Sequence, residues 1–117
     1  MNIALFRIGA SLCFLAVALG AFGAHALKGR LELNATAEIW KTAVLYHFVH
    51  ALAIFILGLH GGTSRAPTWF FSSGILLFSG SLYLMALTNL RWLGAITPIG
   101  GLCFLAGWAW LVVKPLQ

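Results

Sequence analysis

The stretch APTWFFSSGILLFSGSLYLMALTNL, residues 66–90, runs for 25 residues without a charged side chain. A transmembrane helix needs about 20 predominantly apolar residues, because each residue adds about 1.5 Å to its length. Three further charge-free stretches meet that length, at residues 8–27, 42–64 and 92–113. A soluble domain carries about one-quarter charged residues, whereas this chain of 117 residues carries 8%. The sequence therefore excludes a water-soluble globular fold and predicts an all-α membrane protein.

The short connections between these stretches predict one domain, an antiparallel bundle of four transmembrane helices. We expect spans at about residues 3–26, 35–59, 68–87 and 92–113. Asn34 is expected to cap the start of the second helix. Residues 60–67 are rich in helix breakers, which indicates a loop. Pro98 is expected either to kink the fourth span or to end a distorted first segment.

The N-terminal span has an alternative interpretation. Arg7, the apolar run after it and the sequence Ala24-His25-Ala26 resemble a signal peptide with an A-x-A cleavage site. Because the run is long enough to cross a membrane, we expect it to be a retained helix.

Small residues and tryptophans support this layout. Small residues let helices approach closely in lipid, and tryptophan favours the membrane interface, where we expect all five tryptophans. We expect the helices to pack at Gly9, Gly20, Gly23, Gly80, Pro98, Gly100 and Gly107.

The net charge of +5 comes from basic residues that are scattered singly between the spans. They form no patch that would indicate a nucleic-acid partner, and we interpret them as anchors for anionic lipid headgroups. Arg7 either extends to the headgroups or faces the interior of the bundle. Three basic side chains lie on one side and four on the other, and this balance predicts no orientation.

Ionisable residues inside a span are costly and by default indicate a functional site. His47 and His50 lie three residues apart, on one face of the second span. Counting along the helices from the nearest boundary places three more polar residues in the same half of the bundle. The candidate ligand or proton site is therefore His25, His47, His50, Tyr83 and Thr97.

This set of side chains is compatible with several chemistries. Three histidines bind zinc or copper, and imidazoles beside a tyrosine relay protons or bind a quinone-like head group. A haem with two imidazole ligands needs one histidine from each of two facing helices. The structural alternative is that His47 and His50 form hydrogen bonds to Tyr83, Thr97 or free carbonyls and hold the helices together.

Two function hypotheses follow. In the first, the chain is a non-enzymatic membrane component or an accessory subunit of a larger complex, in contact with lipids and with other subunits or copies of itself. In the second, it handles a small molecule, a metal or protons at the histidine cluster. The sequence identifies no catalytic residue and no cofactor.

A family resemblance agrees with this architecture. Its motifs are GAFGAH (20–25), WKTAVLYHFVHAL (40–52), FSGSLY (78–83), LGAITPIGG (93–101) and Gly107-Trp108. Together they resemble domain of unknown function 423, a family of small four-span membrane proteins that includes bacterial inner-membrane proteins and the eukaryotic transmembrane protein 256. The resemblance implies an integral membrane protein, in the inner membrane if the source is bacterial, and it leaves the role of the histidines open.

Overall fold

The computed structural model describes residues 1–61 and 65–116. Their helical segments are, in chain order, α1 (Ile3–Ala24), α2 (Lys28–Leu33), α3 (Ala37–His60), α4 (Ala66–Gly74), the π-helix η1 (Ile75–Ser79), α5 (Gly80–Thr88), the 3₁₀-helix η2 (Arg91–Ala95) and α6 (Thr97–Val113). Four helices are long and apolar enough to cross a membrane: α1, α3, the continuous helix α4–η1–α5, and η2 with α6. The prediction of an all-α, multi-pass transmembrane protein is confirmed.

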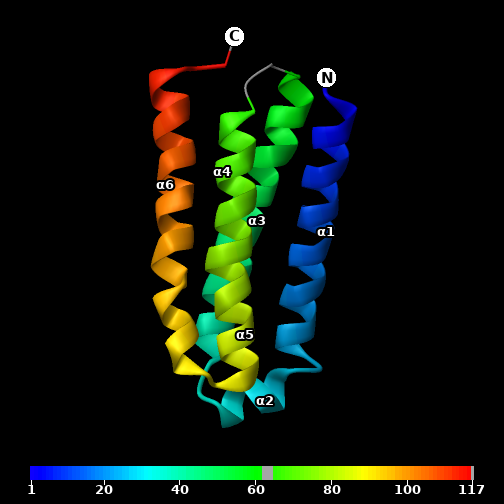
Figure 1. Cartoon of the computed structure of the whole chain (residues 1–117). Helices are drawn as coiled ribbons and strands as arrows, with labels where there is room; N and C mark the ends of the chain where they lie inside the picture. Colours follow the sequence, from blue (N-terminus) through cyan, green and yellow to red (C-terminus); the bar gives the residue numbers. More distant parts are fainter. Residues whose placement is uncertain (62–64, 117) are drawn as a thin grey trace.

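Successive spans run in opposite directions, and both ends of the chain lie at the same end of the bundle (Figure 1). α2 lies across the opposite end, between α1 and α3. α1 packs against α3, whereas α6 packs against α4 and η1. The second and third spans therefore form the centre of the bundle, and α1 and α6 form its two sides.

Glycines allow the closest approaches between spans. A Cβ atom on Gly9 would lie 2.5 Å from the backbone of Phe55, and one on Gly58 would lie 2.5 Å from the backbone of α1. A Cβ atom on Gly100 would overlap the backbone of Phe78 in η1. At these contacts α1 meets α3 and α6 meets the third span, with no room for a side chain.

Three other predicted packing positions also face a neighbouring helix. Gly23 lies against the indole of Trp40, and Gly107 lies against the ring of Phe71. The contact at Gly20 is looser, because an added Cβ atom would lie 3.4 Å from the nearest side chain.

Two predicted packing positions are wrong. Gly80 donates its N–H to the carbonyl of Ile75, and an added Cβ atom would meet only that carbonyl, at 3.9 Å. The wider π turn therefore places Gly80 against its own helix and not against a neighbour. Pro98 is exposed in the first turn of α6, where its missing N–H costs no hydrogen bond.

The connection between α1 and α3 differs from the prediction. α1 ends at Ala24, and a short helix, α2, follows before α3 begins at Ala37. Asn34 does not cap α3: its side-chain amide donates to the carbonyls of Ala86 at 3.1 Å and Leu87 at 3.3 Å. The hydroxyl of Thr36 donates to the same Ala86 carbonyl, at 2.8 Å. The last carbonyls of a helix have no partner within it, so both side chains cap the end of α5 instead.

The other connections are close to expectation. His60 is the last residue of α3, and Gly61 follows it in the left-handed region with φ of 75°. Residues 62–64 of the predicted loop lie outside the described residues. Pro98 follows the 3₁₀-helix η2, so the distorted first segment, and not the kink, is the correct alternative.

Candidate functional site

α3 carries both interior histidines. The side chains of His47 and His50 are 1% and 4% exposed. They lie on one helix face, as predicted, but their ring nitrogens have different partners.

His50 forms hydrogen bonds through both ring nitrogens. Nδ1 lies 2.8 Å from the carbonyl oxygen of Tyr46, and Nε2 accepts a hydrogen bond of 2.9 Å from the indole N–H of Trp108 in α6. The ring also stacks on Phe104, with centroids 3.6 Å apart and planes at 10°. A neutral imidazole has one donor and one acceptor, so these partners fix the proton on Nδ1. His50 therefore joins α3 to α6 and has no free nitrogen for a ligand.

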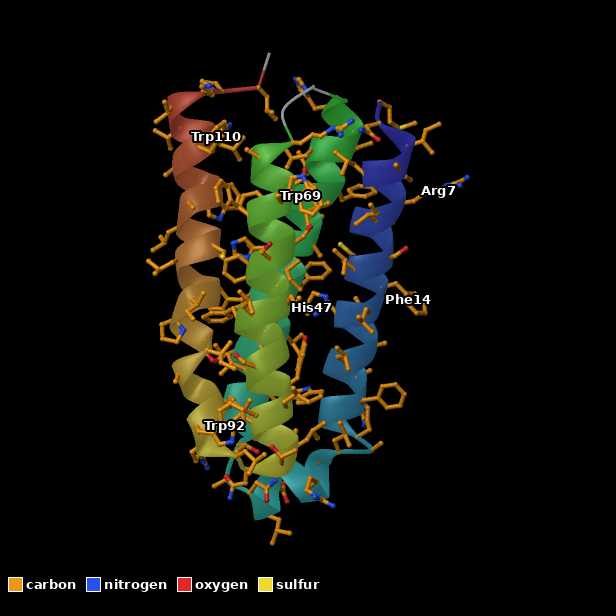
Figure 2. All side chains as sticks on the ribbon, viewed as in Figure 1. Arg7, Phe14, His47, Trp69, Trp92 and Trp110 are labelled. Atoms are coloured by element: carbon orange, nitrogen blue, oxygen red, sulfur yellow. The ribbon has the colours of Figure 1, made fainter. Side chains whose placement is uncertain are left out.

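His47 is bonded through one nitrogen only. Nδ1 lies 2.8 Å from the hydroxyl of Tyr83 in α5. Figure 2 shows His47 near the middle of the bundle, between the third span (α4–η1–α5) and α1. Nε2 is buried and has no hydrogen-bond partner in the described part of the chain. If Tyr83 donates to Nδ1, the N–H on Nε2 faces the backbone of Leu12 in α1 without a hydrogen bond of good geometry, and in the other tautomer Nε2 is a bare acceptor.

A second polar group lies where α5 meets α6. The hydroxyls of Ser81 and Thr97 are 2.7 Å apart, and the Ser81 hydroxyl also lies 3.0 Å from the carbonyl of Phe78. Thr97 is therefore bonded to a serine and not to a histidine. Next to this pair, the hydroxyl of Ser79 donates to the carbonyl of Ala43 at 2.8 Å.

The structure divides the predicted five-residue set. His47 pairs with Tyr83, whereas Thr97 pairs with Ser81. His25 is exposed at the end of α1. Within residues 1–61 and 65–116, no group of three or more His, Cys, Asp or Glu side chains is placed to hold a metal ion. The two interior histidines share one helix, an arrangement that does not supply the facing pair needed by a haem.

Two of the tryptophans that we expect at the membrane interface also donate hydrogen bonds between helices. Trp108 donates to His50. Trp40 is 3% exposed and donates to the carbonyl of Leu19 at 2.9 Å. Trp108 and Phe104 are four residues apart on one helix face, a spacing that indicates a shared partner.

Two of the basic side chains are exposed at opposite ends of the bundle. Arg7 is exposed and points away from the bundle (Figure 2), which is the headgroup alternative. At the start of α3 the ammonium of Lys41 lies 3.3 Å from a carboxylate oxygen of Glu38, and both side chains are exposed.

A family model described as "Protein of unknown function (DUF423)" matches residues 19–101. That segment is well over half of the chain. The chain belongs to this family. The matched segment contains all five residues of the predicted site and ends before Trp108. No solved structure matches the chain.

Curated relatives of similar length carry membrane-protein names. The UPF0382 membrane protein SH2409 of Staphylococcus haemolyticus is 46% identical over 97% of this chain and 96% of its own length. The UPF0382 membrane protein YwdK of Bacillus subtilis is 44% identical over 94% of each chain. The chain is thus an integral membrane protein that resembles these UPF0382 membrane proteins along nearly its whole length.

Proposed function

We propose that this chain is a non-enzymatic membrane component, an accessory subunit that packs against other membrane proteins. The observation that carries the proposal is the use of His50, an interior ionisable residue whose two ring nitrogens both bond to the protein itself. Such a residue stabilises a bundle, and its own ring has no nitrogen left to bind a ligand.

The exposure of the two outer helices supports a partner. In the apolar windows of α1 and α6, 11% and 17% of the residues are buried, compared with 39% and 44% in the two central spans. α1 therefore has one covered face, against α3, and a wide apolar face that is free for another transmembrane helix.

Photocrosslinking inside the native membrane tests this proposal. Phe14 is 78% exposed on the outer face of α1 (Figure 2), whereas Phe71 in α4 is fully buried. We expect p-benzoylphenylalanine at position 14 to give one discrete adduct with another membrane protein, and the same residue at position 71 to give none. Lipid adducts alone at position 14, or the same adduct at both positions, would contradict the proposal.

His47 favours a second candidate function, the binding of a proton or of a small polar ligand. Its supporting observation is the buried Nε2 atom without a partner in the described residues, beside the Tyr83 hydroxyl. A proton carrier must change its charge between about pH 5 and pH 8. ¹⁵N NMR of the histidine rings in the purified protein tests this requirement, with His50 as the internal comparison. An unchanged His47 ring over this range, together with no metal, haem or other bound group in the native preparation, excludes the candidate.

A further inference from the structure

A groove of about 300 Å³ lies between α1 and α4, at the end of the bundle where the chain termini lie. Its walls come from two turns of each helix, and they are Asn2, Ala4, Leu5, Ile8, Arg65, Thr68, Trp69 and Ser72. They lie within residues 2–8 on one side and 65–72 on the other, which gives the groove a length of about 10 Å along the bundle. We propose that this groove binds one phospholipid with an anionic headgroup.

The groove changes in polarity along its length, as a phospholipid does. Leu5 and Ile8 form the part nearer the bilayer centre, and Arg65 lies just outside the start of α4. Trp69 is 70% exposed and lies near the end that also carries Arg7 and Trp110 (Figure 2). Exposed tryptophans mark the depth of the headgroups. The part of an acyl chain nearest the headgroup therefore fits along the apolar walls, with the phosphate of the lipid at the level of Arg65.

The polar side chains favour a phosphate with a negative charge. The hydroxyl oxygen of Thr68 is buried and has no hydrogen-bond partner among the described residues, so its side chain must rotate before the hydroxyl can donate to a phosphate oxygen in the groove. Both acidic residues of the chain, Glu32 and Glu38, lie at the opposite end, in α2 and at the start of α3. Arg65 therefore faces a headgroup without a competing carboxylate side chain.

A second groove, at the α2 end, provides a contrast. It lies between α1 and α3 and has a single basic residue, Lys41, on its rim. Lys41 is already paired with Glu38. That groove therefore has apolar walls, but among its described lining residues no unpaired cation is available for an anionic headgroup.

Native mass spectrometry of the detergent-purified full chain tests the proposal. The probes are phosphatidylglycerol and phosphatidylcholine with the same acyl chains, each added alone and in competition. We expect one phosphatidylglycerol to bind about fivefold more tightly than phosphatidylcholine, since one basic residue contributes about that factor at an anionic membrane surface. Equal binding of the two lipids, or a lipid-free dimer, would overturn the proposal.

Matched variants locate the site. We expect Arg65→Gln to abolish the fivefold preference, and Thr68→Val to weaken phosphatidylglycerol binding. Arg7→Gln removes a cation from the same end of the bundle but outside the groove, and it should retain the preference. An equal loss with Arg7→Gln and Arg65→Gln would show a general surface attraction and would overturn the proposal.

Two further measurements test whether the lipid needs the apolar wall of the groove and whether it needs its acyl chains. Ala4→Phe fills the groove beside its apolar wall and should reduce the binding of both lipids, while Arg65 stays in place. Inorganic phosphate at millimolar concentration should not displace the lipid, because it lacks the acyl chain. Displacement by phosphate, or unchanged lipid binding in Ala4→Phe, would contradict a phospholipid in this groove.

Discussion

His50 and His47 show how differently two histidines three residues apart on one helix face are used. The ring of His50 lies between a backbone carbonyl and an indole N–H, whereas the ring of His47 has one phenol partner and one bare nitrogen. An unpaired buried polar atom costs more than an average hydrogen bond contributes. At the residue scale, His50 is therefore a stabilising contact, and His47 is the residue with unused bonding capacity.

Trp108→Phe tests the contribution of the His50 contact. The variant keeps an aromatic ring but leaves Nε2 of His50 buried without its donor. We expect the free energy of unfolding to fall by about 1 kcal/mol, measured by unfolding in mixed detergent micelles. Trp110→Phe is the matched control, because the indole nitrogen of Trp110 is buried without a partner in the described residues. An equal loss in both variants would show that ring size, and not the hydrogen bond, is responsible.

Charge spacing in the sequence predicted which residues lie inside the membrane, but it did not predict their partners. Counting from Lys41 placed His47 and His50 well inside the second span, because helical rise is constant, and both side chains are buried in the bundle. The pairing of His50 with Trp108 depends on the rotation of α6 about its axis, which packing against Phe78 and Phe71 determines. An apolar sequence without a polar face carries little information about such a rotation.

At the scale of the element, the third span differs most from a regular helix. η1 is a five-residue π turn in the middle of an otherwise α-helical span. A π turn holds one residue more than an α-helical turn and is often found at functional sites. Here it contains Ser79, whose hydroxyl donates a hydrogen bond to the carbonyl of Ala43 on α3.

Deletion of Leu76 tests whether the extra residue is separable from the fold. Leu76 is 72% exposed and lies in η1, so its loss should convert the π turn to an α turn and keep both flanking helices in register. We expect folded protein at a level within about threefold of the parent, as judged by size-exclusion chromatography. The control is deletion of Leu105, which is also exposed but lies in the regular helix α6. That deletion rotates Trp108 away from His50 and should abolish folding, and an equal loss in both deletions would contradict this interpretation of η1.

Gly9→Ala tests the close contact between α1 and α3. The new methyl group would lie 2.5 Å from the backbone of Phe55, so the helices must separate, at a cost of about 1–3 kcal/mol in stability. Gly29→Ala in α2 is the control, because an added Cβ atom there has no neighbour within 4 Å. We expect that control to keep or slightly raise stability in the same unfolding measurement. Unchanged stability of Gly9→Ala would contradict the prediction and would show that the α1–α3 contact tolerates separation.

Apolar length was sufficient to predict the four spans, whereas helix ends depended on contacts distant in sequence. Asn34 has the side chain of an N-cap, yet it bonds to the end of α5 because those carbonyls lie nearby. The π turn has no marker in the sequence, since four of its five residues are apolar and the fifth, Ser79, is common in membrane helices. Long-range contacts therefore decided the features that the sequence did not predict.

At the scale of the whole molecule, the bundle is a flattened body with Cα extents of 48 × 26 × 16 Å. The central spans cover one another, and the outer spans each present a wide face to the surroundings. Both acidic residues belong to the α2 end, whereas Arg7, Arg65 and Lys114 belong to the end with the termini. The two membrane surfaces of the protein thus differ in charge composition.

Cysteine labelling tests this arrangement of ends in intact cells or sealed vesicles. In a background with Cys13→Ala and Cys103→Ala, we expect Arg65→Cys and Lys114→Cys to react with a membrane-impermeant maleimide from the same side. Glu32→Cys should react only from the opposite side, because α2 and the termini lie at opposite ends. Labelling of Glu32→Cys and Lys114→Cys from one side would contradict four antiparallel spans.

The bonds from Asn34 and Thr36 to the end of α5 also have a consequence for biogenesis. They join residues at least 50 positions apart, and the ribosome makes positions 34 and 36 well before position 86. The first two spans are therefore synthesised before the partner of their connecting segment exists. Closure of the α2 end is a late step of assembly, and until the third span arrives the newly made hairpin presents these free donors to its surroundings.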